Sequence, residues 1–287
     1  MAPHAIDTKS PAAVVAVVKN AFALISAQAS FPLLDRLFAD VTNMFNGKYP
    51  GYLGIDMHYH DYEHTLQATV CLIQILEGRH RTGDKPILSA RDWELAVIAV
   101  LLHDTGYLKH ADDRDGTGAK YTLIHESRSC EFARSYLPSL GIKPAEIDDV
   151  CAAISCTGPQ NKISQMTFSR ESARVIAFIL VTADYLGQMS APDYVDELPM
   201  LFGEFEEAFE FEHVPEQKRS YHEISELLEK TPRFWENYVR PLLDFEAGGV
   251  HRYLTTAGQP NPYLQAVEAN IAEVQRRLRE RTGKKIG

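Results

Sequence analysis

Several signals that would place the chain among secreted, membrane or zinc-finger proteins are missing. Its four cysteines include no Cys-x-x-Cys pair, so the sequence indicates neither a zinc knuckle nor a disulfide framework. No apolar stretch approaches the length that crosses a membrane, and the first residues lack the basic segment and apolar core of a secretory signal. We therefore expect a soluble cytoplasmic protein with buried free thiols, at Cys71, Cys130, Cys151 and Cys156.

An excess of positive charge is also lacking. The chain carries 39 acidic and 29 basic side chains, which gives a formal net charge of -10. This balance argues against a general nucleic-acid binder, because such proteins rely on attraction to phosphates. A small anionic substrate stays compatible with the negative charge if a local metal site reverses the electrostatic field. We expect neither a nucleic acid nor a membrane as a partner.

No stretch alternates apolar and polar residues over a convincing length, and no repeat recurs at a fixed period, so no strand is expected. Apolar residues instead recur at the three- and four-residue spacing of amphipathic helices. We predict an all-α fold with a break at Pro199 and surface loops at 79–86 and 109–120. The predicted helices are 11–28, 31–45, 61–77, 89–102, 121–137, 144–155, 169–187, 192–211, 221–229, 232–247 and 262–281.

The most unusual feature is an apolar run, 97–102, that leads directly into His103 and Asp104. The run is expected to be a buried helix segment. Burying a carboxylate without a partner costs several kcal/mol, so Asp104 needs a cation nearby. The simpler alternative is an ordinary helix C-terminus, with His103 facing the helix dipole and Gly106 as the C-cap.

The remaining histidines and carboxylates favour a functional site. His60 and His64 are four residues apart, so on a helix they share a face and suit two metal ligands, or one ligand beside a proton donor. His125 opens a predicted helix, and Asp184 stands near the end of another apolar helix. Ionisable side chains on several apolar helices are most economically explained by a metal centre. Nitrogen and carboxylate ligands suit Zn, Mn, Fe or Mg.

The order of these residues resembles that of the HD-domain metal-dependent phosphohydrolases, and most closely the catalytic domain of class I cyclic nucleotide phosphodiesterases. Tyr59–His64 (YHDYEH) is similar to their YHNxxH signature, and 102–104 (LHD) to their HD motif. The segment 183–186 (ADYL) resembles their A-x-D-L segment. The segment 234–242 (FWENYVRPL) is similar to the helix that carries their base-clamping Phe. The resemblance covers about 58–245 and implies an HD-domain, phosphodiesterase-like helical bundle.

The resemblance also implies roles for individual residues. A first metal ion would be held by His64, His103, Asp104 and Asp184. Asp104 would bridge to a second ion, so two divalent ions (Mn, Mg, Zn or Fe) are expected, and His125 is a further candidate ligand. A hydroxide formed from water between the ions would attack phosphorus. His60 would protonate the leaving oxygen and would need an acidic neighbour, which the sequence does not identify. Phe234 would form the aromatic clamp.

The chain departs from the phosphodiesterase pattern in two places. Thr231 stands where the family has a glutamine that grips the purine, and a hydroxyl cannot make that two-pronged contact. The second histidine that follows the HD pair is missing, whereas His125 with Ser129 four residues later is more typical of the broader HD superfamily. Gln188, one turn after Asp184, is a further candidate substrate contact.

We therefore expect a catalytic core at 51–250, N-terminal helices at 1–50 packed on it, and a basic C-terminal helix at 251–287. The expected activity is hydrolysis of a small phosphoester, with a nucleotide or cyclic nucleotide as the candidate substrate. The alternatives are an HD-type nucleotide phosphomonoesterase, an HD-type di-iron oxygenase and a non-catalytic sensor module. The oxygenase is disfavoured because no histidine lies between His125 and Asp184, and the sensor because no expected first-metal ligand is lost. The sequence leaves open whether the protein forms a homodimer.

Overall fold

The structure is a computed structural model that describes residues 5–26, 31–255 and 258–283. Within these ranges it contains ten α-helices and no β-strand, and its one isolated extended pairing joins Tyr52 and His110. The predicted all-α fold is therefore confirmed. Parts of the predicted helix 11–28 and of the basic segment 251–287 lie outside the described residues.

Most of the helices lie close to their predicted positions. Two π-helical turns, Trp235–Val239 and Leu242–Glu246, continue from the ninth helix. The α-helices are α1 (Pro11–Ile25), α2 (Pro32–Phe45), α3 (Tyr62–Thr82), α4 (Ala90–Leu102), α5 (His125–Tyr136), α6 (Pro144–Ser155), α7 (Glu171–Met189), α8 (Tyr194–Phe211), α9 (Ile224–Phe234) and α10 (Pro262–Gly283).

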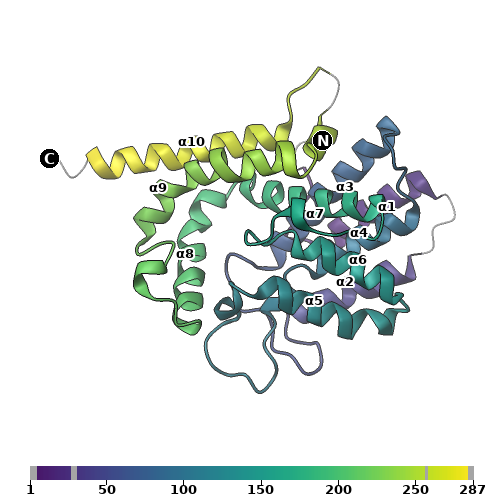
Figure 1. Cartoon of the computed structure of the whole chain (residues 1–287), viewed down its shortest axis with the longest axis horizontal. Helices are drawn as coiled ribbons and strands as arrows, with labels where there is room; N and C mark the ends of the chain where they lie inside the picture. The colour runs from purple at the N-terminus through teal and green to yellow at the C-terminus, as the bar shows by residue number, and fades with distance from the viewer. Residues whose placement is uncertain (1–4, 27–30, 256–257, 284–287) are drawn as a thin grey trace.

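The helices are arranged around α3 and α7, which pack extensively on one another. On one side, α1 packs on α3 and α2 packs on α4, while α10 packs on α7, α8 and α9. In Figure 1, α8, α9 and the long α10 lie to the left, α1 to α6 lie to the right, and α7 lies between them. One connected hydrophobic core extends from Val14 in α1 to Val274 in α10.

Small residues allow α3 and α7 to approach closely. A Cβ atom added at Gly187 of α7 would lie 2.9 Å from backbone atoms of Ala68 in α3, closer than side chains tolerate. His64 lies about one turn before Ala68, and Asp184 about one turn before Gly187. The close crossing therefore brings one imidazole and one carboxylate from distant parts of the chain to the same place.

Both ends of α4 are as predicted. Ser89 caps the helix, and its side chain and that of Asp92 form the reciprocal hydrogen bonds of a capping box. At the other end, His103 is the C-cap, and the chain continues into a short 3₁₀ turn, Thr105–Tyr107. Gly106, the C-cap in the alternative of an ordinary helix terminus, is therefore not the C-cap. Glycine is needed there because a Cβ atom would lie 1.9 Å from the carbonyl oxygen of His125.

Three predicted interruptions of helices are also wrong. α3 continues into the predicted loop 79–86, because the buried Arg79 donates to the Pro86 carbonyl and the helix ends only at the left-handed Gly83. α8 passes through Pro199, which lies in its second turn and removes a single N–H donor. Pro232 is likewise inside α9, so the predicted segments 221–229 and 232–247 form one continuous helical stretch.

The loop 109–120 is less exposed than predicted, because its two lysines are buried against carboxylates. Lys109 is 4% exposed and pairs with Asp56 at 3.1 Å, while it also donates to the Gly116 carbonyl. Lys120 is 5% exposed and pairs with Asp113 at 2.6 Å. Lys109 therefore ties this loop to Asp56, and Lys120 ties the end of the loop to its middle.

Among the residues that the structure describes, no single helix is both long and apolar enough to cross a bilayer. The pair α7 and α8 passes the criteria only when the two are taken together, and they are bent by 111° where they join.

Candidate metal centre

Side chains from α3, α7 and the end of α4 meet in the interior of the bundle. The Nε2 atoms of His64 and His103 lie 3.3 Å apart. Asp104 Oδ2 lies 3.4 Å from Nε2 of His64 and 3.3 Å from Nε2 of His103. Asp184 Oδ1 lies 3.1 Å from Nε2 of His64 and 3.5 Å from Nε2 of His103. The structure thus brings together the four residues that the resemblance assigns to a first metal ion.

The separations among His64, His103 and Asp104 fit one small divalent ion, and Asp184 approaches both imidazoles. With ligands about 2.0 to 2.1 Å from the metal, neighbouring ligand atoms lie about 3.3 to 3.4 Å apart in a tetrahedral site and about 3.0 Å apart in an octahedral one. When both Nε2 atoms are unprotonated they have no proton to share, and their approach at 3.3 Å then requires a positive charge nearby. His64, His103 and Asp104 alone already form a group whose ligand atoms could bind one ion.

Burial makes an unbalanced charge at this place costly. His64, His103 and Asp104 are 3%, 1% and 2% exposed, and Asp104 Oδ2 makes no hydrogen bond. Burial alone would lower the pKa of His103, but the carboxylates of Asp104 and Asp184 raise it to about 9. Burial alone would raise the pKa of Asp104, but the surrounding imidazoles bring it below its usual value. The site therefore favours a cation between the carboxylates, either a proton or a metal ion.

Backbone contacts orient the ligand candidates. His103 donates from Nδ1 to the Val100 carbonyl at 2.7 Å, which leaves its Nε2 lone pair facing the centre. Ser129 of α5 donates to the His103 carbonyl and accepts from the Gly106 N–H at 2.8 Å. One hydroxyl therefore ties both ends of the turn that contains Asp104. By contrast, Nδ1 of His64 is buried without a hydrogen-bond partner.

His125 stands on the other side of Asp104. Its Nε2 atom is 3.7 Å from Asp104 Oδ1, whereas Asp104 Oδ2 faces His64 and His103. His125 donates from Nδ1 to the Thr122 carbonyl at 2.8 Å, so its Nε2 lone pair points toward the carboxylate. His125 therefore lies outside the group of residues assigned to the first metal ion. The two oxygens of Asp104 face opposite sides, which is the arrangement of a bridging carboxylate.

The acidic neighbour of His60 is Glu204 of α8, which sequence reasoning missed. His60 Nδ1 and Glu204 Oε2 lie 2.6 Å apart, and Glu204 Oε1 accepts from the backbone N–H of Tyr59 at 2.8 Å. Burial alone would lower the pKa of His60, but the Glu204 carboxylate raises it above its ordinary value. Glu204 shares the apolar stripe of α8 with Leu201 and Ala208, and an acidic residue on such a stripe is the signal that could have identified it.

An aromatic stack connects the candidate proton donor with His125. The ring of Tyr107 lies 5.1 Å from that of His60 at an interplanar angle of 27°. Tyr107 also stacks on His125, with ring centroids 4.6 Å apart and an angle of 10°, and the rings of His60 and His125 lie 6.2 Å apart, so the three rings form one cluster. Tyr107 is 1% exposed, so the stack is held rigidly beside Asp104.

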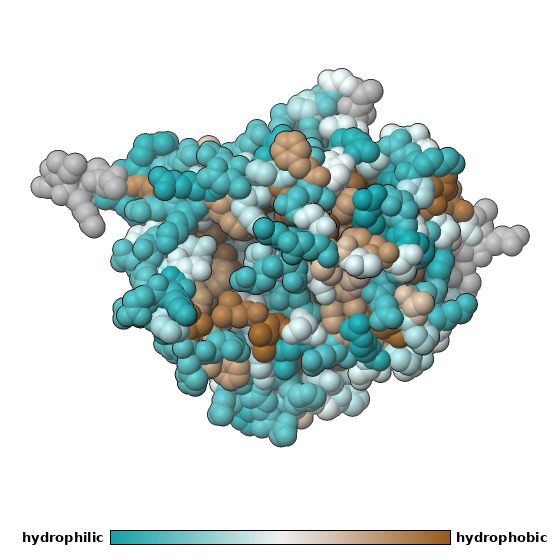
Figure 2. Space-filling view, in the orientation of Figure 1, coloured by the Kyte–Doolittle hydropathy of each residue, from teal (hydrophilic) through white to brown (hydrophobic). Residues whose placement is uncertain are grey.

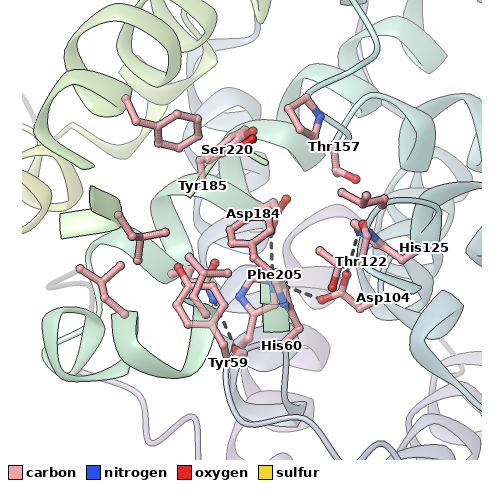
Figure 3. A pocket seen from close by; sticks show the side chains of 18 of the residues that line it. Tyr59, His60, Asp104, Thr122, His125, Thr157, Asp184, Tyr185, Phe205 and Ser220 are labelled. Carbon is pink, nitrogen blue, oxygen red and sulfur yellow. Dashed lines mark hydrogen bonds and ion pairs between the residues drawn. The ribbon is translucent and has the colours of Figure 1, made fainter. Parts of the chain in front are cut away.

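Of the metal-centre residues, His64, Asp104 and Asp184 line a cavity of about 380 Å³, and His103 does not. Gln188, Thr231 and Phe234, the predicted substrate contacts, all line it. Gln188 donates weakly to the Tyr59 carbonyl at 3.4 Å, and Thr231 donates to the Leu227 carbonyl at 2.8 Å. Figure 3 shows Asp104 and His125 on one side of the cavity, with Tyr185 and Ser220 on the other.

Comparisons with known proteins relate this site to a family. No curated protein matches the chain. A family model described as Npun_R2479-like matches residues 51–138 and 142–277, which amounts to well over half of the chain. The matched ranges contain the metal-centre residues, the candidate proton donor His60 and its partner Glu204. The chain therefore belongs to the Npun_R2479-like family.

Proposed function

We propose that this protein is a metal-dependent phosphohydrolase of the HD type that cleaves a phosphoester. The observation that carries the proposal is the group formed by His64, His103, Asp104 and Asp184, whose facing atoms lie 3.1 to 3.5 Å apart in the contacts named above. A paired imidazole, His60, lies in the same cavity. Ligand set and proton donor together are the parts that metal-assisted hydrolysis requires.

Divalent ions bound here would polarise phosphoryl oxygens and make a bound water more acidic. The protein's own residues supply the proton transfer at the leaving oxygen. Because Nδ1 of His60 faces the Glu204 carboxylate, its proton is retained there and Nε2 is directed to the cavity. In the imidazolium form, Nε2–H can protonate a leaving alkoxide, and Glu204 favours that form.

Two observations favour hydrolysis over oxidation. No histidine stands between His125 and Asp184 in the sequence, so a second ion would have His125 as its nearest imidazole ligand. The His60–Glu204 pair has a direct use in protonating a leaving group, which an oxygenase reaction does not require. The proposal does not extend to cyclic nucleotides, because the Thr231 hydroxyl that replaces the purine-gripping amide already donates to the Leu227 carbonyl.

The test is hydrolysis by the Mn²⁺-loaded protein of p-nitrophenyl phosphate and bis-p-nitrophenyl phosphate. The wild-type protein should turn over at least one of them, and Asp104→Asn should lower kcat/KM at least about 100-fold. Asp112→Asn, which removes a carboxylate at an exposed position, is the matched control and should behave like the wild-type protein. The ratio of the two activities distinguishes a diesterase from a monoesterase.

Metal content measured by mass spectrometry should accompany the kinetics. A protein that binds Mn²⁺ at stoichiometric amounts but hydrolyses neither ester would contradict the proposed reaction while leaving the metal site intact. Oxygen consumption by the Fe²⁺-loaded protein would instead support the oxygenase alternative.

A further inference from the structure

None of the described residues that line the cavity above the metal centre is a lysine or an arginine. Its charged groups are carboxylates, Asp104, Asp184 and Glu126, together with the imidazoles of the centre. Positive charge for an anionic substrate therefore comes only from the ions and imidazoles of the centre. A second or third phosphate farther from the ions would be desolvated without a partner, which is costly.

One wall of the cavity is apolar. α8 contributes two leucines and two phenylalanines, α9 one leucine and the end of α7 a methionine: Leu198, Leu201, Phe205, Phe209, Leu227 and Met189. Leu201 and Phe205 are half-buried and the other four are buried, so the apolar surface that a ligand can cover lies mainly on Leu201 and Phe205. In Figure 2, apolar side chains gather in a hollow on the left, over the region where Figure 1 has α8 and α9 facing the rest of the bundle.

Two of the polar side chains on the same side are occupied by the protein's own backbone. The Thr231 hydroxyl donates to the Leu227 carbonyl at 2.8 Å, and the Gln188 amide donates to the Tyr59 carbonyl at 3.4 Å. The Thr231 and Gln188 oxygens can still accept, but the six apolar side chains offer no hydrogen bond, so a polar heterocycle or a sugar placed against those six would lose hydrogen bonds to water. An apolar group has no such cost, and it gains from leaving water.

We infer that the substrate carries a single phosphate, bound at the metal centre, on an uncharged apolar group that fills the chamber formed by α8 and α9. The inference rests on the proposed phosphohydrolase function and specifies its substrate class. The cavity of about 380 Å³ is large enough for an alkyl chain or a ring system beside the phosphate. Nucleoside polyphosphates do not fit this distribution of charge.

The test measures binding rather than turnover: two of the ligands are phosphonates, which cannot be hydrolysed, and ³¹P NMR shows whether the third, adenosine 5′-monophosphate, stays intact. Isothermal titration calorimetry of the Mn²⁺-loaded wild-type protein would compare methylphosphonate, hexylphosphonate and adenosine 5′-monophosphate. Each buried methylene strengthens binding about fourfold at most, so the five added methylenes of hexylphosphonate should lower Kd by at least about 30-fold even if half of the gain is lost. Adenosine 5′-monophosphate should bind more weakly than hexylphosphonate.

A pair of matched variants locates the effect. Leu201→Asn makes the chamber wall polar at nearly constant volume and should reduce the preference for hexylphosphonate at least about fivefold. Leu24→Asn makes the same change at a side chain that is 59% exposed on α1, and should leave the preference unchanged. Thermal unfolding of both variants shows whether the chain remains folded, and methylphosphonate affinity reports on the metal centre separately.

The outcomes separate this inference from the proposed function. Equal affinity for methyl- and hexylphosphonate, or tighter binding of adenosine 5′-monophosphate, would overturn the apolar substrate class while the phosphohydrolase proposal stands. Binding of 1-hexanol without binding of any phosphonate would support the apolar chamber and contradict the phosphohydrolase proposal. If neither 1-hexanol nor any phosphonate bound to the metal-loaded protein, both would be wrong.

Discussion

Replacing Glu204 with glutamine is the most informative single change, because it removes a charge and almost no volume. Glu204 Oε1 accepts from the Tyr59 N–H at 2.8 Å, and Oε2 lies 2.6 Å from His60 Nδ1. In Glu204→Gln the amide oxygen is expected to stay with the Tyr59 N–H, so the amide NH₂ would face His60. Nδ1 would then have to accept a hydrogen bond, which favours neutral over protonated His60.

The size of the effect follows from the distance and the burial. Glu204 is 6% exposed, so its charge is poorly screened by solvent. The Glu204 carboxylate raises the pKa of His60, so we expect that pKa to fall in the variant. General acid catalysis contributes about 100- to 10,000-fold, so kcat/KM at neutral pH should fall at least about 30-fold.

The assay is the pH profile of kcat/KM with the Mn²⁺-loaded enzyme. A general acid is active below its pKa, so wild-type activity should decline as pH rises through the raised pKa of His60. In Glu204→Gln the same decline should occur at lower pH. The pair also contributes stability that is present at low pH and is lost as pH rises through the folded-state pKa of His60.

The control is Glu206→Gln, which removes the same charge from an exposed position on the same helix. It should reproduce the wild-type profile. Metal content and the unfolding midpoint identify a variant that has merely lost its structure. A Glu204→Gln protein that is folded and metal-loaded, with an unchanged alkaline decline and unchanged kcat/KM, would refute the assignment of His60 as the proton donor.

Three further predictions concern the ligands and the turn that contains Asp104. Removing divalent ions with a chelator should lower the unfolding temperature by about 5 to 10 °C in differential scanning calorimetry. The reason is that an ion at about 100 times its Kd stabilises the folded state by about 2.7 kcal/mol. An unchanged unfolding temperature would argue against a metal centre. Gly106→Ala should destabilise the protein by about 3 kcal/mol or more in urea unfolding, because the new Cβ atom meets the His125 carbonyl at 1.9 Å. Ser129→Ala should cost about 1 to 3 kcal/mol in the same assay and reduce Mn²⁺ affinity, because the His103 carbonyl and the Gly106 N–H lose a shared partner; a stable variant with wild-type affinity would contradict that role.

The all-α fold and the ligand candidates could be predicted from local sequence. Helical periodicity is a short-range signal, because each helix hydrogen-bonds to itself and presents its apolar face at regular intervals. A carboxylate at the end of an apolar run, as at Asp104 and Asp184, marks a buried charge without knowledge of any distant residue. The capping pair Ser89 and Asp92 was predictable for the same reason, since its partners are three residues apart.

Tertiary structure alone decided the features that depend on residues far apart in the chain. Glu204 meets His60 across 144 positions, and no local pattern connects the two. The helices continue through Pro199 and Pro232 because packing outweighs the loss of one N–H each, and Lys109 is buried because Asp56 and the Gly116 carbonyl meet its ammonium group. Whether a buried polar group is paired, and which surface a cavity presents, depends on long-range contacts that only the folded chain creates.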